Sequence, residues 1–157
     1  MEKVPVTSAG YQAMQEELKT LKTVERPAVI KAIAEAREHG DLSENAEYHA
    51  ARERQSFIEG RVLELEDAIS RVSVIDPADN KSDDVRFGAT VTLVDEDTEE
   101  EKKYQIVGEY EADINIGRLS LGAPLARALI NKSVGDSVEV NTPGGLKVYE
   151  VVEIDYV

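Results

Sequence analysis

Two carboxylates, Asp41 and Glu44, stand three residues apart in the polar stretch HGDLSEN at residues 39–45. Carboxylate oxygens are ligands that Mg²⁺ prefers, and proteins often hold this ion with one or two carboxylates plus a substrate phosphate. Two acids form an incomplete site, so a second molecule would have to supply the other ligands. A plainer interpretation makes Asp41 a helix N-cap and Glu44 a first-turn acid, each stabilising a helix by roughly 0.3–2 kcal/mol. The spacing alone favours capping, and the two roles are compatible.

Arginines follow and precede these acids. Arg52 lies eight residues beyond Glu44, which is about 12 Å along a helix. Positive charge behind the acids would steer a phosphate chain towards a metal there, and Arg37, Arg52 and Arg54 are the candidates. The plain interpretation is ion pairing on the helix surface, and Arg54 stays open between the two. The candidate pairing partners are Glu38, Glu53 and Glu59.

The remaining residues of this stretch are expected to shape it. We expect Gly40, Ser43, Asn45 and Tyr48 to do so. Core packing is the expected role of the Tyr48 ring, with contact to a nucleobase as the alternative. The two histidines, His39 and His49, are expected at a helix end and on the surface rather than as metal ligands.

The elements that must carry these residues are two long helices. Residues 8–75 show helical periodicity, and Gly40 is expected to end the first helix. An apolar seam with heptad spacing runs through Tyr48, Ala51, Gln55, Ile58, Val62, Leu65, Ile69 and Val72, and Gln55 is its one polar member. The first arm carries Tyr11, Met14, Leu18 and Leu21, then Val29, Ile33 and Ala36. Pro27 predicts a kink or short break near 24–26. The pattern predicts an antiparallel coiled-coil hairpin at 1–76, about 45 Å long.

The second half of the chain has strand periodicity. A polar linker is predicted at 77–84, followed by a small antiparallel sheet with one helix at 85–157, so the fold class is α+β with two domains. The expected strands are 89–94, 104–107, 118–121, 137–140 and 147–154, and the expected helix is 124–131. Pro143-Gly144-Gly145 predicts a hairpin turn. The acidic run at 95–101 is expected to be a solvated loop.

Composition narrows the functional classes. The chain of 157 residues has no cysteine, which excludes disulfides and thiolate metal sites, and no apolar run long enough to span a membrane. Its first residues lack the apolar core of a signal peptide, so a cytoplasmic location is expected. The formal net charge of −14 argues against free nucleic acid as the main partner.

Several stretches together resemble one family. EAREHGDLSENAEYHAARERQ, the acidic linker, FGATVTL, IVGEYEAD, APLARALINKSVGD and NTPGG occur in the order typical of the Gre family of bacterial transcript-cleavage factors, over essentially the whole chain. The resemblance implies an N-terminal coiled-coil hairpin and a C-terminal FKBP-like domain that docks on the rim of the RNA polymerase secondary channel. It also implies that the hairpin enters this channel and stimulates cleavage of the RNA 3′ end in backtracked or arrested complexes.

The resemblance assigns roles to individual residues. Asp41 and Glu44 match the acids that help hold the second Mg²⁺ jointly with the polymerase, and Arg37 and Arg52 match a basic patch that contacts the nascent RNA 3′ segment. The segment 119–129 matches the polymerase-docking region, in which we favour Ser120, Pro124 and Leu125. Gly122 stands where relatives often carry a polar or acidic residue. The plain alternative for this segment is a helix start with proline in its first turn.

The resemblance also implies what the protein is not. It is expected to be no nuclease by itself, because it stimulates the endonucleolytic activity of RNA polymerase, and to act as a monomer. Prolyl isomerase activity needs an aromatic-lined pocket, whereas residues 77–157 contain one Phe, four Tyr and no Trp. Two alternatives stay open: an inhibitor that binds the channel, and a coiled-coil chaperone or adaptor without cleavage activity.

Overall fold

The computed structural model describes residues 3–41 and 44–157, which form two compact units. One unit contains residues 11–72, and the other contains residues 3–10 together with residues 73–157. This division differs from the predicted boundaries at 76 and 84, because residues 3–10 and 73–84 belong to the unit that contains the large sheet. The two units are described separately below.

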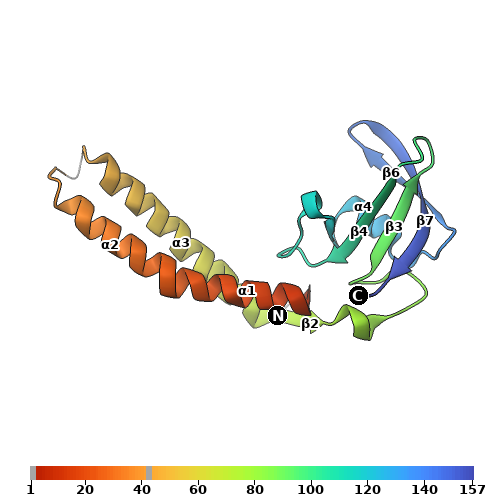
Figure 1. The fold of residues 1–157 in the computed structure, drawn as a ribbon, viewed down its shortest axis with the longest axis horizontal. Coiled ribbons are helices and arrows are strands. Elements are labelled where there is room, and N and C mark those ends of the chain that lie inside the picture. The colour runs from red at the N-terminus through yellow and green to blue at the C-terminus, as the bar shows by residue number, and fades with distance from the viewer. Residues whose placement is uncertain (1–2, 42–43) are drawn as a thin grey trace. The chain divides into compact units, whose positions relative to one another are not determined.

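The first unit is the predicted helical hairpin (Figure 1). Its first arm contains α1 (Ser8–Thr20, whose first three residues belong to the other unit), a π-helical turn (Leu21–Glu25) and α2 (Arg26–Arg37). Its second arm is α3 (Ala46–Arg71), which lies beside α2. The buried side chains are Met14, Leu21, Val29, Ile33 and Ala36 on the first arm and Ile58, Val62, Leu65 and Ala68 on the second. No helix in the described part of the chain is long and apolar enough to cross a membrane.

The π-helical turn accounts for the shift in the apolar pattern before Pro27. Its closing bond runs from the Arg26 N–H to the Leu21 carbonyl, five residues back. Buried Leu21 and Val29 are eight residues apart, whereas two α-helical turns take about 7.2 residues. A π turn adds roughly one residue and so keeps both side chains in the seam. The expected break is therefore a π bulge within a continuous helical arm.

Ion pairs join the two arms along their length. The pairs are Arg61–Glu17 at 2.7 Å, Lys22–Glu66 at 2.9 Å, Arg26–Glu59 at 2.7 Å and Arg54–Glu25 at 2.8 Å. Exposed pairs stabilise a fold only weakly, by up to about 1 kcal/mol each. Together these ion pairs favour one register of the two helices over the alternatives. Arg54 thus has a structural partner, Glu25, which is none of the three predicted acids.

The second unit is built on a five-stranded sheet (Figure 1). The strand order is β5-β4-β3-β7-β6, and the strands are β3 (Thr90–Asp95), β4 (Glu101–Val107), β5 (Arg118–Ser120), β6 (Ser137–Thr142) and β7 (Gly145–Asp155). All neighbours are antiparallel except β4 and β5, so the sheet is mixed. The predicted short helix is α4 (Pro124–Leu129). The strands β1 (Val4–Thr7) and β2 (Val72–Ile75) form a separate two-stranded sheet.

The parallel β4–β5 pair depends on the connection between these strands. Residues 108–117 contain a short 3₁₀ helix (Ile114–Ile116) that ends at Gly117, whose φ is +78°. A Cβ at this glycine would lie 2.9 Å from the Lys103 carbonyl oxygen. Gly117 therefore permits both the left-handed turn and the close approach to β4. A two-residue hairpin turn would have made the pair antiparallel instead.

The acidic run between β3 and β4 is only partly the solvated loop that we predicted. Asp95 is 3% exposed, and its carboxylate accepts hydrogen bonds from the backbone N–H groups of Asp97 at 2.8 Å and Thr98 at 3.2 Å. The bond from Asp97 holds the pKa of Asp95 below its usual value. Asp95 therefore shapes the turn, while the residues after it are exposed.

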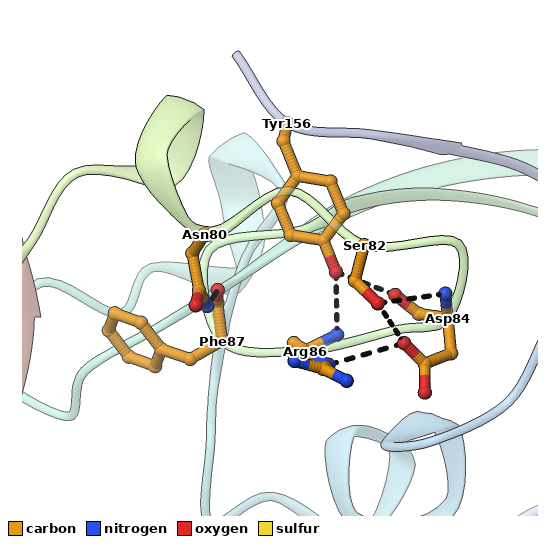
Figure 2. A network of polar contacts seen from close by, with 6 residues as sticks. All are labelled: Asn80, Ser82, Asp84, Arg86, Phe87 and Tyr156. Carbon is orange, nitrogen blue, oxygen red and sulfur yellow. Dashed lines mark hydrogen bonds and ion pairs between the residues drawn. The ribbon is translucent and has the colours of Figure 1, made fainter.

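A tyrosine near the C-terminus anchors the predicted linker (Figure 2). The Tyr156 hydroxyl donates to the Asp84 carbonyl at 2.6 Å and accepts from the Arg86 N–H at 2.9 Å. The Asp84 carboxylate in turn accepts from the Ser82 hydroxyl and from Arg86 Nε. Asn80, in the 3₁₀ helix Pro77–Asn80, donates to the Phe87 carbonyl at 2.8 Å. Residues 80–87 are therefore held by side-chain contacts on the sheet unit.

Candidate functional site

The end of the hairpin is an exposed polar turn. After α2, the Glu38 N–H donates to the Glu35 carbonyl and the His39 N–H to the Ala36 carbonyl. Gly40 follows with a φ of +115°, a backbone conformation that residues other than glycine rarely adopt. The helix α2 ends at Arg37 with Glu38 as its C-cap, so the predicted end at Gly40 lies three residues further on, where the glycine lets the chain turn. Asp41 and Glu44 are both exposed, and Ser43 lies outside the described residues.

Asn45 joins the two helices at this turn. Its side-chain oxygen accepts from the Tyr48 N–H at 3.1 Å, which caps the N-terminus of α3. Its side-chain nitrogen donates to the Ala36 carbonyl in the last turn of α2 at 2.6 Å. The prediction that Asp41 caps the second helix is therefore wrong, because that helix begins at Ala46, after Asn45. One amide instead fixes both ends of the segment that carries Asp41 and Glu44.

The two predicted acids line one shallow hollow. The residues around it are His39, Asp41, Glu44, Asn45, Ala46 and Glu47. Glu47 is a third exposed acid that our reading of the motif missed, although it stands three residues after Glu44 in the first turn of α3. Its carboxylate lies 3.8 Å from the His39 ring nitrogen. The structure therefore brings the predicted acids to one place.

The carboxylates at this hollow have the chemistry of Mg²⁺ ligands. Carboxylate oxygens are suitable ligands for a hard cation. Among the described residues, no group of three or more acids, histidines or cysteines is arranged to hold a metal ion. Asp41 and Glu44 therefore carry oxygen ligands of the kind that such an ion prefers, and a metal shared with another molecule stays a prediction.

The predicted basic residues Arg37 and Arg52 also come together. They lie on facing helices, α2 and α3, and line a second hollow on the hairpin. The Arg37 guanidinium lies 5.9 Å from the centre of the Tyr48 ring, a distance suitable for a cation–π contact. The edge of the neighbouring His49 ring packs against Tyr48 at 5.6 Å between centroids. Tyr48 is half-buried, and its role in core packing stays a prediction.

The predicted docking residues lie in one segment of the sheet unit. Ser120 ends β5, and its hydroxyl accepts from the Gly122 N–H at 3.3 Å. The Ala123 N–H donates to the Ser120 carbonyl at 2.9 Å, which closes a turn before Pro124. Pro124 is exposed in the first turn of α4, whereas Leu125 is half-buried and packs against the core. Pro124 is therefore the most available of the three for contact with a partner, whereas Ser120, like Leu125, is half-buried.

The hairpin and the mixed-sheet unit each correspond to a stretch of the chain that a family model matches. Two family models match the chain: "Transcription elongation factor, N-terminal" over residues 4–74 and "Transcription elongation factor, GreA/GreB, C-term" over residues 79–156. The chain therefore belongs to the GreA/GreB family of transcription elongation factors. The resemblance identified from the sequence motifs and the predicted fold class are confirmed.

Individual relatives agree with this assignment. The chain is 64% identical to the transcription elongation factor GreA of Phenylobacterium zucineum over 157 residues, which is the full length of both chains. It is 68% identical to the transcription elongation factor GreA of Cereibacter sphaeroides, again over both full lengths. It is also similar to a solved structure of GreA factor homolog 1 of Thermus thermophilus, at 27% identity and a TM-score of 0.45, covering 98% of this chain and 99% of that chain.

Proposed function

We propose that this elongation factor stimulates RNA polymerase to cleave the 3′ end of RNA in backtracked or arrested complexes. The observation that carries the proposal is the pair of exposed carboxylates, Asp41 and Glu44, in one hollow at the end of a two-helix hairpin. A two-helix rod is narrow enough to enter the secondary channel of the polymerase. The acids would then act at the polymerase active site rather than at a site of their own.

The carboxylates would act on a metal that the polymerase shares. In two-metal hydrolysis, Mg²⁺ stabilises the attacking and leaving oxygens and helps to generate the nucleophilic water. Asp41 and Glu44 would hold the weaker of the two ions and orient the attacking water by accepting its hydrogen bonds. Because the pair is an incomplete site, the free protein would bind Mg²⁺ only weakly and would be no nuclease by itself.

The basic residues and the sheet unit would position the complex. Arg37 and Arg52 lie outside the acidic hollow and would hold the phosphates of the RNA 3′ segment. Ser120, Pro124 and Leu125 would contact the rim of the channel. We propose that one monomer serves one polymerase in the cytoplasm, because a single channel admits a single rod.

The test is cleavage of labelled RNA in stalled, backtracked polymerase complexes with Mg²⁺. We expect the wild-type protein to stimulate cleavage only with polymerase present. Replacing both acids, Asp41→Ala with Glu44→Ala, should lower the cleavage rate at saturating protein by at least about 100-fold, since the second metal would lose its added ligands. Binding of the double variant to polymerase should persist.

Three other results would separate the alternatives. Equal cleavage with the double variant would assign the two acids a purely structural role. Slower RNA synthesis without cleavage would identify an inhibitor. Protection of an unfolding client protein without any effect on polymerase would identify a chaperone.

A further inference from the structure

The hollow that contains Arg37 and Arg52 has an apolar floor as well as a charged rim. Ile30, Ile33 and Ala34 of α2 line one side, and Gln55 of α3 lies beside the two arginines. The hollow has a volume of about 220 Å³. Ile30 is 53% exposed although it lies beside buried Ile33. An apolar surface next to two arginine side chains is therefore exposed to solvent.

The two arginines differ from the other arginines of the hairpin helices. Arg26, Arg54, Arg61 and Arg71 each pair with an acid at 2.7–2.9 Å. Within the described ranges, neither Arg37 nor Arg52 makes an ion pair with an acid. Two guanidinium groups at one hollow repel each other, and an anion between them would relieve that repulsion. Guanidinium groups bind phosphate with two parallel hydrogen bonds, so a phosphate is the anion that this arrangement suits.

Gln55 adds a group that can recognise a base edge. It is the polar member of the otherwise apolar seam and is half-buried. Among the described residues, its side chain has no hydrogen-bond partner, so both the donor and the acceptor of the amide are available. An amide can form two hydrogen bonds with adenine, to N6 and N7. An apolar floor suits the face of a planar base.

We propose that this hollow binds one nucleobase of the RNA 3′ segment, with adenine preferred, while Arg37 and Arg52 hold the adjacent phosphate. Ile30 packs against the face of the base and Gln55 bonds to its edge. The proposal rests on the proposed function for the RNA itself. It adds a base-binding subsite, and therefore a preference among 3′ ends, to a surface that otherwise recognises phosphate alone.

The first test uses the full chain without polymerase. The protein is titrated with adenosine 5′-monophosphate, cytidine 5′-monophosphate and ribose 5-phosphate and observed by NMR. We expect the adenine nucleotide to shift the Ile30 methyl and Gln55 side-chain amide signals, the cytosine nucleotide to shift them less, and ribose 5-phosphate to shift only the arginine signals. If adenosine monophosphate leaves Ile30 and Gln55 unchanged up to about 10 mM, the proposal is wrong.

The second test uses backtracked polymerase complexes. Ile30→Ala should raise the protein concentration for half-maximal cleavage about five-fold, the effect of losing roughly 1 kcal/mol of apolar contact. Leu63→Ala is the matched control, because Leu63 is 70% exposed on α3 outside the hollow. An abasic 3′ nucleotide should weaken the wild-type protein by at least this factor, because the contact with Gln55 is lost as well. The same abasic nucleotide should weaken Ile30→Ala by less than it weakens the wild type. Gln55→Leu should abolish the preference for adenine.

The two proposals fail in different ways. If the wild-type protein cleaves abasic and normal RNA equally well, the hollow binds no base, and the cleavage function still stands. If the wild-type protein stimulates no cleavage while adenosine monophosphate shifts Ile30 and Gln55, the cleavage function fails and the base-binding hollow is supported.

Discussion

At the scale of single residues, Asn45 holds the turn that carries the two acids at the end of the hairpin. Asn45 bonds to the Tyr48 N–H and to the Ala36 carbonyl, so it closes the segment that contains Asp41 and Glu44. We therefore expect the placement of the two carboxylates to depend in part on this amide.

We predict that two substitutions at Asn45 separate capping from bridging. Asn45→Ala removes both bonds and should lower the stability of the hairpin by about 1 kcal/mol, the usual cost of a lost N-cap. Asn45→Ser keeps a cap and should be nearly as stable as the wild type, but it cannot reach Ala36. Both variants should lower the saturating cleavage rate several-fold, measured beside urea unfolding. Full activity in Asn45→Ser would show that the bridge to Ala36 does not position the acids.

At the scale of elements, α3 contains a glycine that neither its backbone nor its surroundings require. Gly60 lies inside this helix, and no atom lies within 4 Å of a Cβ added there. Glycine in a helix interior costs about 0.5–1 kcal/mol relative to alanine. The hairpin is therefore less stable than the same hairpin with alanine at this position.

We predict that Gly60→Ala stabilises the hairpin by about 0.5–1 kcal/mol, measured by urea unfolding followed by far-ultraviolet circular dichroism. Gly40→Ala is the matched control. It has equal space around it but a φ of +115°, so it should destabilise the turn by roughly 1–2 kcal/mol. A loss of stability in Gly60→Ala would mean that the folded helix needs glycine at position 60.

At the scale of the whole molecule, the sheet unit is closed by Tyr156, whose hydroxyl bonds to residues at the other end of the unit's sequence. Burial raises the pKa of this hydroxyl above its usual value. The folded protein therefore holds the proton more tightly than the unfolded chain. The resulting stability is complete below pH ~10 and is lost as the pH rises through the folded pKa.

We predict that Tyr156→Phe destabilises the sheet unit by about 1–3 kcal/mol at pH 8, because the Asp84 carbonyl and the Arg86 N–H lose a partner. The difference between wild type and variant should shrink as the pH rises above ~10. Urea unfolding between pH 8 and 11, observed by far-ultraviolet circular dichroism, measures both effects. A difference that stays constant with pH would contradict the assigned role of the hydroxyl.

The sequence by itself determined what depends on short-range periodicity. The heptad seam located the hairpin, since buried Ile58, Val62 and Leu65 stand at the predicted positions. Alternation and turn residues located the five strands and the short helix within a few residues. The spacing of the HGDLSEN motif located the exposed acids and the glycine between the helices. These features depend on residues that are close together in the sequence, so the residue types and their spacing predict them.

Only the tertiary structure decided which distant groups meet. Asn45, and not the predicted Asp41, is the N-cap of the second helix. Its side chain also bonds to the Ala36 carbonyl on the other helix. Tyr156 bonds to Asp84, which is 72 residues away in sequence. The parallel β5 strand follows from how residues 108–117 cross back to β4. A hydrogen bond between distant residues leaves no periodic trace in the sequence, since its energy depends on geometry that forms only when the chain has folded.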